Sequence, residues 1–221
     1  MIYLPKSQPG PIAELNAQKL AGGTYNIEAV LTALKNDSHG KCYICELKNP
    51  SSIEIEHFVS HKGDNDLKFS WNNLFFSCRH CNNSKGAVVF DDILNCSVLA
   101  DDIEGSIKFI LNPIPKELPS FEALNTSNRT LNTIDLLNKV YVGQTPQKKL
   151  EASGLRMLLL NDVLNFHVLL RDHDQTENVD LKEFYRLKIV AELESKSAFT
   201  AFKRRIVKDN VNLMAEFGQY V

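Results

Sequence analysis

The segments CYIC at residues 42–45 and CRHC at residues 78–81 decide how this chain folds. A C-x-x-C turn directs both of its sulfurs at one point, and two such turns give the four-thiolate tetrahedron that zinc prefers. The predicted zinc ligands are Cys42, Cys45, Cys78 and Cys81. Because protein fills all four positions, we predict a structural zinc site with no place for a water nucleophile. The alternative is two unrelated, reduced cysteine pairs.

The composition is that of a globular protein with a buried core. The chain has 221 residues, of which 43% are hydrophobic and 24% charged. No apolar run approaches the roughly 20 residues that a membrane span needs. The start, MIYLPKSQPGPIAEL, lacks the basic and apolar stretches of a secretory signal. We therefore expect a cytoplasmic protein with no membrane contact, in which cysteine pairs stay reduced and bind metal. The fifth cysteine, Cys96, is expected to be a small buried hydrophobic side chain.

The hydrophobic pattern predicts an α+β chain that is mainly helical. The expected elements are a helix after Asn26, strands at 53–58 and 74–76, a helix from near Asn82, a strand at 106–111, and helices at 130–141, 146–171, 181–196 and 198–217. Thr145-Pro146 and a capping box at Asp180 and Glu183 predict two of the helix starts. We divide the chain into an amino-terminal arm and helix at 1–40, a knuckled module at 41–112 and a helical region at 113–221.

The segment between and after the cysteine pairs carries the residues with catalytic chemistry. It reads EIEHF at residues 54–58, WNNL at 71–74 and CRHCNNSKG at 78–86. Hydrolysis of a phosphodiester needs a base to deprotonate water, a divalent cation to stabilise charge on the phosphate, and oxygen ligands for that cation. A histidine beside a carboxylate, with asparagines from a later strand and helix, supplies these groups.

Residues 41–86 resemble the HNH endonuclease family, in which a ββα-metal fold lies within a pair of zinc knuckles. The resemblance implies that His57 is the general base, and that Glu56 and Asn82 bind a catalytic Mg²⁺ or Mn²⁺ ion through oxygen. Asn73 matches the central asparagine, which holds the loop and orients the histidine. Lys85 is close enough to the phosphate path to be a nucleic-acid contact.

The geometry of a strand leaves the choice of acid open. Neighbouring strand residues point to opposite faces, so Glu54 and Glu56 share one face and His57 takes the other. Glu56 and His57 act together only where the strand ends or twists, and the family pattern favours Glu56 because it places the acid directly before the histidine. We assign no role to His61 or His80.

A longer and more diffuse similarity covers the helix before HGKCYICE and the later segments ILNP (110–113) and NTIDLLN (132–138). These segments resemble the HNH nuclease subunit of Septu-type antiphage systems (PtuB-like), which some retron operons also encode. The resemblance implies an ATPase partner (PtuA-like), or a retron reverse transcriptase complex, with the nuclease inactive until phage infection. It departs at residues 58–62, where the subgroup usually has a proline before the lysine.

The formal net charge of −2 is unusual for a protein that binds nucleic acid by itself, because phosphate neutralisation supplies most non-specific affinity. The one basic run without an acid is residues 196–208. It is either a phosphate-binding face, with Lys203, Arg204 and Arg205 as contacts, or a solvated side of the last helix. Weak intrinsic binding is consistent with delivery by a partner that docks on the 113–221 region.

The sequence therefore predicts a metal-dependent HNH endonuclease, with DNA as the favoured substrate, that works with an ATPase partner in antiphage defence. The alternatives are an RNA-cleaving (tRNA-cleaving) retron effector, a stand-alone homing or restriction enzyme, and a zinc-knuckle interaction module without catalysis. Convergence of Glu56, His57 and Asn82 discriminates an enzyme from the interaction module.

Overall fold

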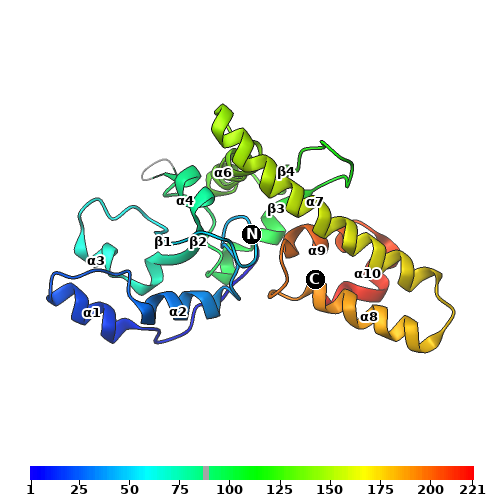
Figure 1. The fold of residues 1–221 in the computed structure, drawn as a ribbon, viewed down its shortest axis with the longest axis horizontal. Helices are drawn as coiled ribbons and strands as arrows, with labels where there is room; N and C mark the ends of the chain where they lie inside the picture. The colour runs from blue at the N-terminus through cyan, green and yellow to red at the C-terminus, as the bar shows by residue number, and fades with distance from the viewer. Residues whose placement is uncertain (87–89) are drawn as a thin grey trace.

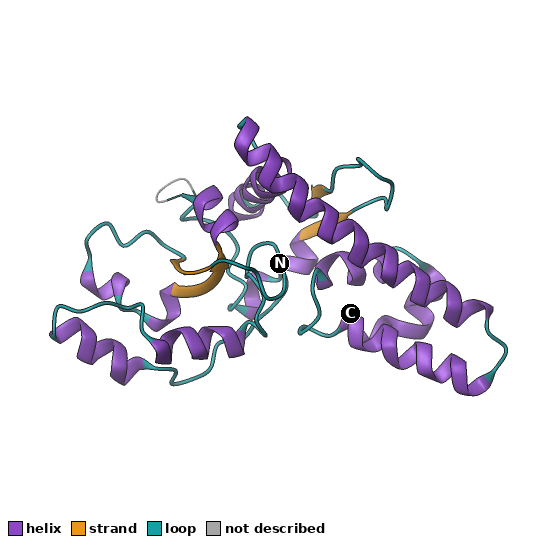
Figure 2. Cartoon of the chain, in the orientation of Figure 1, coloured by secondary structure: helices purple, strands orange, loops and turns teal. Residues whose placement is uncertain are grey.

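The computed structural model describes residues 1–86 and 90–221, and its ribbon is shown in Figures 1 and 2. The helices are α1 (Ile12–Leu20), α2 (Glu28–Asp37), α3 (Asn65–Lys68), α4 (Arg79–Lys85), α5 (Ile103–Ser106), α6 (Asn128–Val142), α7 (Pro146–Gln175), α8 (Val179–Leu193), α9 (Thr200–Lys208) and α10 (Val211–Phe217). The strands are β1 (Ile53–His57), β2 (Leu74–Cys78), β3 (Ile107–Ile110) and β4 (Ser120–Ala123). The predicted class, α+β and mainly helical, is confirmed.

The knuckled module is a hairpin followed by a helix. Strand β1 pairs antiparallel with β2, in a register that places His57 opposite Leu74. Cys78 is both the last residue of β2 and the N-cap of α4. The helix therefore begins three residues before the predicted start near Asn82, because the second C-x-x-C turn itself forms the first helical turn. The helix ends at Gly86, whose φ of 68° suits a residue without a side chain.

The amino-terminal arm covers one face of this hairpin, and Figure 1 shows α1 and α2 beside β1 and β2. Their shared cluster of buried side chains comprises Leu15, Val30, Leu34, Ile55, Phe69, Trp71, Leu74 and Phe76. The helix predicted after Asn26 begins later, at Glu28, because Ile27 keeps an extended backbone with φ −123° and ψ 157°. The N–H of Asn26 is already bound by the hydroxyl of Thr24, 3.1 Å away.

A second hairpin links the module to the helical region. Strand β3, which was predicted, pairs antiparallel with β4, which was not. This pairing spans the boundary predicted between residues 112 and 113. The rings of Phe109, Phe121, Tyr141 and Phe202 pack edge-on or tilted, with centroids 5.5–6.0 Å apart. One aromatic core therefore joins β3, β4, α6 and α9.

Helices α7 to α10 form the carboxy-terminal part. Thr145 caps α7 by accepting from the N–H of Lys148 at 3.2 Å, as predicted. The predicted capping box at Asp180 is wrong, because Asn178 occupies the N-cap position of α8 and accepts from the N–H of Leu181. The single helix predicted at 198–217 is two helices, because Asn210 breaks it and caps α10. Across the described residues, no helix is both long and apolar enough to pass through a bilayer.

The basic run does not form a phosphate-binding face. Lys203 has no exposed surface, and its ammonium group lies 2.8 Å from Asp162 and also pairs with Glu192. Arg204 binds the carboxylate of Glu104 at 2.8 Å, and Arg205 pairs with Asp209 one helical turn later. The predicted nucleic-acid contact at Lys203 is therefore wrong, and acids of the same chain neutralise the charges of Arg204 and Arg205.

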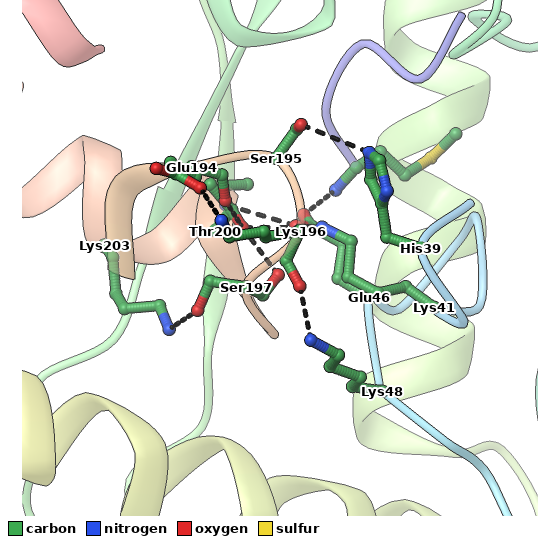
Figure 3. Close-up of polar contacts among 12 residues, drawn as sticks. His39, Lys41, Glu46, Lys48, Glu194, Ser195, Lys196, Ser197, Thr200 and Lys203 are labelled. Carbon is green, nitrogen blue, oxygen red and sulfur yellow. Dashed lines mark hydrogen bonds and ion pairs between the residues drawn. The ribbon is translucent and has the colours of Figure 1, made fainter. Parts of the chain in front are cut away.

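The segment between α8 and α9 lies against the first knuckle, as Figure 3 shows. The ammonium group of Lys41 lies 3.4 Å from both Glu46 Oε2 and Thr200 Oγ1, and Glu46 Oε2 also accepts from the N–H of Ala201. Burial alone raises the pKa of Glu46, but the Met1 amino group and Lys41 outweigh it and hold this pKa at about 2. Glu46 is therefore a buried carboxylate that joins the knuckle to α9.

The substitution Lys203→Met tests the internal use of the basic run. It fills the same space but leaves Asp162 and Glu192 without their cation, so we expect a loss of about 3 kcal/mol in the free energy of unfolding. The matched control Arg205→Met removes a helix-surface pair and should cost about 0.5 kcal/mol. Urea unfolding midpoints at equal slope measure both changes. Equal midpoints for the two variants would contradict the assignment of Lys203 as a structural cation.

Candidate active site and metal centre

The two knuckles bring four cysteine sulfurs to one point. The side-chain sulfurs of Cys42, Cys45, Cys78 and Cys81 all lie within 4.8 Å of one another, and all four residues are buried. The sulfurs of Cys45 and Cys78 are 3.9 Å apart. A tetrahedral site with metal–sulfur bonds of about 2.3 Å has sulfur–sulfur edges of about 3.8 Å. The predicted ligand set therefore fits a tetrahedral thiolate-bound metal. Cys96 lies buried outside this group, as expected.

Backbone and side-chain contacts hold the first knuckle in this shape. The turn is closed by the N–H of Glu46, which donates to the carbonyl of Cys42 at 2.8 Å. The hydroxyl of Tyr141, on α6, donates to the carbonyl of Cys45 at 2.9 Å. Burial raises the pKa of the Cys42 thiol, but hydrogen bonds from the three neighbouring thiols outweigh it and place this pKa well below its ordinary value.

A cavity of about 340 Å³ brings together three of the four predicted catalytic residues, Glu56, His57 and Asn82. It is lined by Glu56, His57, Ser60, His61, Asn82, Asn83, Lys85 and Gly86. Strand β1 ends at His57, so residues from both faces of the strand reach the space beyond its end. The convergence of Glu56, His57 and Asn82, which strand alternation made uncertain, is therefore present.

A backbone carbonyl holds one ring nitrogen of His57, and the other ring nitrogen has no hydrogen-bond partner among the described residues. Its Nε2 lies 3.0 Å from the carbonyl oxygen of Lys68. Because a carbonyl only accepts, Nε2 carries the proton in the neutral ring and Nδ1 keeps its lone pair. The Tyr25 ring packs edge-on against the imidazole, with centroids 4.5 Å apart. Burial lowers the pKa of His57, which favours the neutral ring. His57 is therefore a neutral imidazole with an available basic nitrogen.

Asn73 lies outside the cavity and ties down the loop that orients His57. Its Oδ1 accepts from the N–H of Val59 at 2.8 Å. Its Nδ2 donates to the carbonyls of Val59 and Leu67, at 2.9 and 3.1 Å. The side chain thus clamps both ends of the loop that leads to the Lys68 carbonyl. Through this loop Asn73 acts on the orientation of the imidazole.

Glu56 is a buried carboxylate with a partner on each oxygen. Its Oε1 lies 2.8 Å from the ammonium nitrogen of Lys85, and its Oε2 accepts from the hydroxyl of Tyr43. Burial raises the pKa of Glu56 to about 7, although the Lys85 charge opposes this rise. Each carboxylate oxygen has a second lone pair, so these contacts leave Glu56 able to bind a cation.

The structure separates Glu56 from the alternative acid, Glu54. Glu54 lines a different cavity, of about 240 Å³, and accepts a hydrogen bond from Nδ2 of Asn82. Because Nδ2 of Asn82 is engaged, Oδ1 is its remaining ligand atom. Glu56 and Asn82 thus offer a carboxylate and an amide oxygen to one cavity, a donor set that fits a hard divalent cation such as Mg²⁺ or Mn²⁺.

Lys85 lines the cavity with its charge paired to Glu56, and the predicted nucleic-acid contact at this residue stays a prediction. Only 1% of Lys85 is exposed, and its ammonium group binds Glu56 and the carbonyl of His57, the latter at 3.1 Å. Burying a carboxylate is costly unless a cation pairs with it. Lys85 is that cation.

Three residues around the site carried no sequence signal for a role. Tyr25 and Tyr43 belong to segments whose patterns indicate only helix starts and knuckles, and His61 is a loop histidine. His80, which received no role, binds the carboxylate of Glu151 at 2.9 Å and so joins α4 to α7. The contacts of these three residues and of His80 are made with segments distant in the sequence or within the folded loop. The local sequence therefore does not predict them.

Comparison with known proteins places this geometry in a family. The HNH endonuclease family matches residues 42–87. The chain is also 33% identical over 106 residues to the Septu protein PtuB of Bacillus mycoides (strain KBAB4), a match that covers 40% of this chain and 36% of that protein. The chain thus matches little more than a third of this relative's length. The knuckled module is an HNH endonuclease module, and the predicted resemblance to PtuB-like proteins is confirmed.

The substitution Asn73→Ala tests the clamp on the loop. It removes three buried hydrogen bonds, so we expect a loss of roughly 3 kcal/mol in the free energy of unfolding and faster exchange of the Val59 amide hydrogen. The matched control is Asn72→Ala, since Asn72 is exposed and makes one long contact with Gln8 at 3.4 Å. Hydrogen exchange read by NMR measures the local effect. Unchanged protection at Val59 would show that the clamp does not hold the loop.

Proposed function

We propose that this protein is a metal-dependent HNH endonuclease that hydrolyses phosphodiester bonds. The observation that carries the proposal is the one cavity lined by His57, Glu56 and Asn82, in which Nδ1 of His57 has no hydrogen-bond partner among the described residues. A base and two oxygen ligands beside one space are what phosphodiester hydrolysis requires. An interaction module without catalysis has no need for this convergence.

His57 is the proposed general base. Its Nδ1 takes a proton from the attacking water while Nε2–H stays bound to the carbonyl of Lys68. The same carbonyl stabilises the imidazolium that forms, because it accepts from a ring that has become positive. Asn73 positions the carbonyl through the loop clamp. The two residues therefore have different roles, one in proton transfer and one in orientation.

Glu56 and Asn82 are the proposed ligands of a catalytic Mg²⁺ or Mn²⁺ ion. When bound, such an ion stabilises negative charge on the phosphate and on the leaving oxygen. Lys85 favours the charged form of the buried Glu56 carboxyl group, whose pKa burial raises to about 7, and Glu54 holds the amide of Asn82 in the orientation that leaves Oδ1 for a cation. The four-cysteine centre, with its closed donor set, is proposed to bind structural zinc.

The biological setting is proposed from the relative and from charge. The relative is named as a Septu protein, and we propose that this chain is the nuclease effector of a Septu-type antiphage system, with an ATPase partner and DNA as substrate. The charges of Lys85, Lys203 and Arg204 are paired within the chain, and the formal net charge is −2, which favours delivery by a partner. A retron effector that cleaves RNA beside a reverse transcriptase rests on the sequence resemblance alone.

The substitution His57→Ala tests the enzyme. Purified protein, alone and with the ATPase encoded beside it, is incubated with DNA and RNA in Mg²⁺ or Mn²⁺. Loss of a general base should slow cleavage by about 10³-fold, and a chelator should stop it. The control His167→Ala alters a histidine on α7, outside the cavity, and should cleave as wild type does. Equal cleavage by wild type and His57→Ala would remove the enzyme assignment.

Metal analysis tests the structural centre. We expect one zinc per chain, retained in Cys96→Ala and lost in Cys78→Ala. The loss should unfold the knuckled module, since structural zinc contributes on the order of 10 kcal/mol to small domains. Elemental analysis after gel filtration measures the metal, and circular dichroism measures the fold. Full zinc content in Cys78→Ala would exclude the four-cysteine site.

A further inference from the structure

His61 lies beside the proposed base in the same cavity. Both histidines line the 340 Å³ space, and their ring centroids are 4.7 Å apart with an angle of 60° between the planes. His61 belongs to the loop at residues 58–62, where the sequence departs from the subgroup pattern. A phosphate group bound beside His57 in this cavity would therefore also lie close to the His61 ring.

A backbone contact decides which nitrogen of His61 carries the proton. The N–H of Gly63 donates to Nδ1 of His61 at 3.1 Å. The turn that allows this contact is closed by the N–H of Asp64, which donates to the His61 carbonyl at 2.7 Å, and it needs φ 91° at Gly63. Because Nδ1 accepts, the neutral ring carries its proton on Nε2. A protonated Nε2 has no lone pair for a metal, so His61 is a hydrogen-bond donor in this arrangement.

Within the described residues, the Nε2–H donor of His61 has no partner. In residues 1–86 and 90–221, no hydrogen bond from Nε2 of His61 to another residue is present. The side chain is partly buried and lines the cavity. The two histidines are therefore complementary. In His57, Nε2–H donates to the Lys68 carbonyl and Nδ1 keeps a lone pair. In His61, Nδ1 accepts from the Gly63 N–H and Nε2 keeps a proton.

We infer that His61 is a further catalytic residue, whose Nε2–H donates a hydrogen bond to a non-bridging oxygen of the scissile phosphate. The inference rests on the proposed function and adds a residue to it. Negative charge on that oxygen increases as water attacks, so the hydrogen bond strengthens toward the transition state and accelerates the reaction. Loss of one such donor typically slows an enzyme by about 10²- to 10³-fold.

Two isosteric substitutions separate this role from a role in the loop. The side-chain oxygen of His61→Asn can replace Nδ1 and accept from Gly63, but this variant has no donor at the Nε2 position. His61→Gln places an amide N–H near the Nε2 position and loses the loop contact. We expect kcat for DNA cleavage to fall about 100-fold in His61→Asn, with KM changed less than about threefold, and to fall less than about tenfold in His61→Gln. The reverse order would overturn the inference and assign His61 to the loop.

A substrate with a good leaving group tests which oxygen His61 contacts. Bis(4-nitrophenyl) phosphate needs no proton on its leaving oxygen. A donor to the non-bridging oxygen should therefore remain important, and the defect of His61→Asn should persist. A defect on DNA that disappears on the nitrophenyl ester would overturn the inference and make His61 an acid for the leaving group. His167→Asn, on α7, is the matched control for a histidine outside the cavity.

The outcomes distinguish this inference from the proposed function. If wild type cleaves, His57→Ala does not, and His61→Asn equals wild type, the inference is wrong and the endonuclease stands. If wild type and His57→Ala cleave equally, the proposed function fails first. If the chain cleaves only with its partner, the same comparison is made in the complex. There His61→Asn should again cleave about 100-fold more slowly than wild type, and equal cleavage by the two complexes would overturn the inference.

Discussion

The approach of four thiol groups from two knuckles is the constraint on which the candidate site depends. Cys78 ends β2 and starts α4, and Cys81 lies in the first turn of that helix. Once the sulfurs meet, α4 is held across the end of the β1–β2 hairpin. Asn82 and Lys85 follow Cys81 by one and four residues, so the helix carries both of them to the cavity. The four-cysteine cluster thus positions the proposed catalytic site, which contains none of these cysteines.

Within that frame, contacts between buried polar groups set the chemistry of each side chain. Lys85 opposes the rise in the pKa of Glu56 that burial causes, and Lys85 is itself buried because it pairs with this carboxyl group. Asn73 acts at a distance, since its hydrogen bonds fix the loop that offers a carbonyl to His57. A side chain can thus be essential to the geometry without touching a substrate. The family motif contains residues of both kinds, and only the contacts separate them.

The sequence predicts the metal centre and the hairpin well because their signals are local. Two C-x-x-C turns and two short apolar strands are readable without knowledge of distant contacts. The failures have the opposite character. Lys203 belongs to a run without acids, yet its counter-ions Asp162 and Glu192 come from other helices. The proposed donor role of His61 depends on the turn at Gly63, whose N–H fixes the tautomer of the ring. The sequence pattern does not predict this contact. Charge pattern alone therefore cannot distinguish an exposed cation from a buried one.

The same internal use of charge connects the catalytic module to the helical region. Glu46, two residues from Ile44 within the first knuckle's turn, is bound by Lys41 and by the N–H of Ala201 at the start of α9. Tyr141 of α6 binds the carbonyl of Cys45 directly. Two elements of the helical region therefore contact the backbone or side chains that shape the metal centre. Because buried, hydrogen-bonded charges are costly to separate, these contacts fix α6 and α9 against the first knuckle, and the four-cysteine cluster of that knuckle in turn fixes α4 and Asn82.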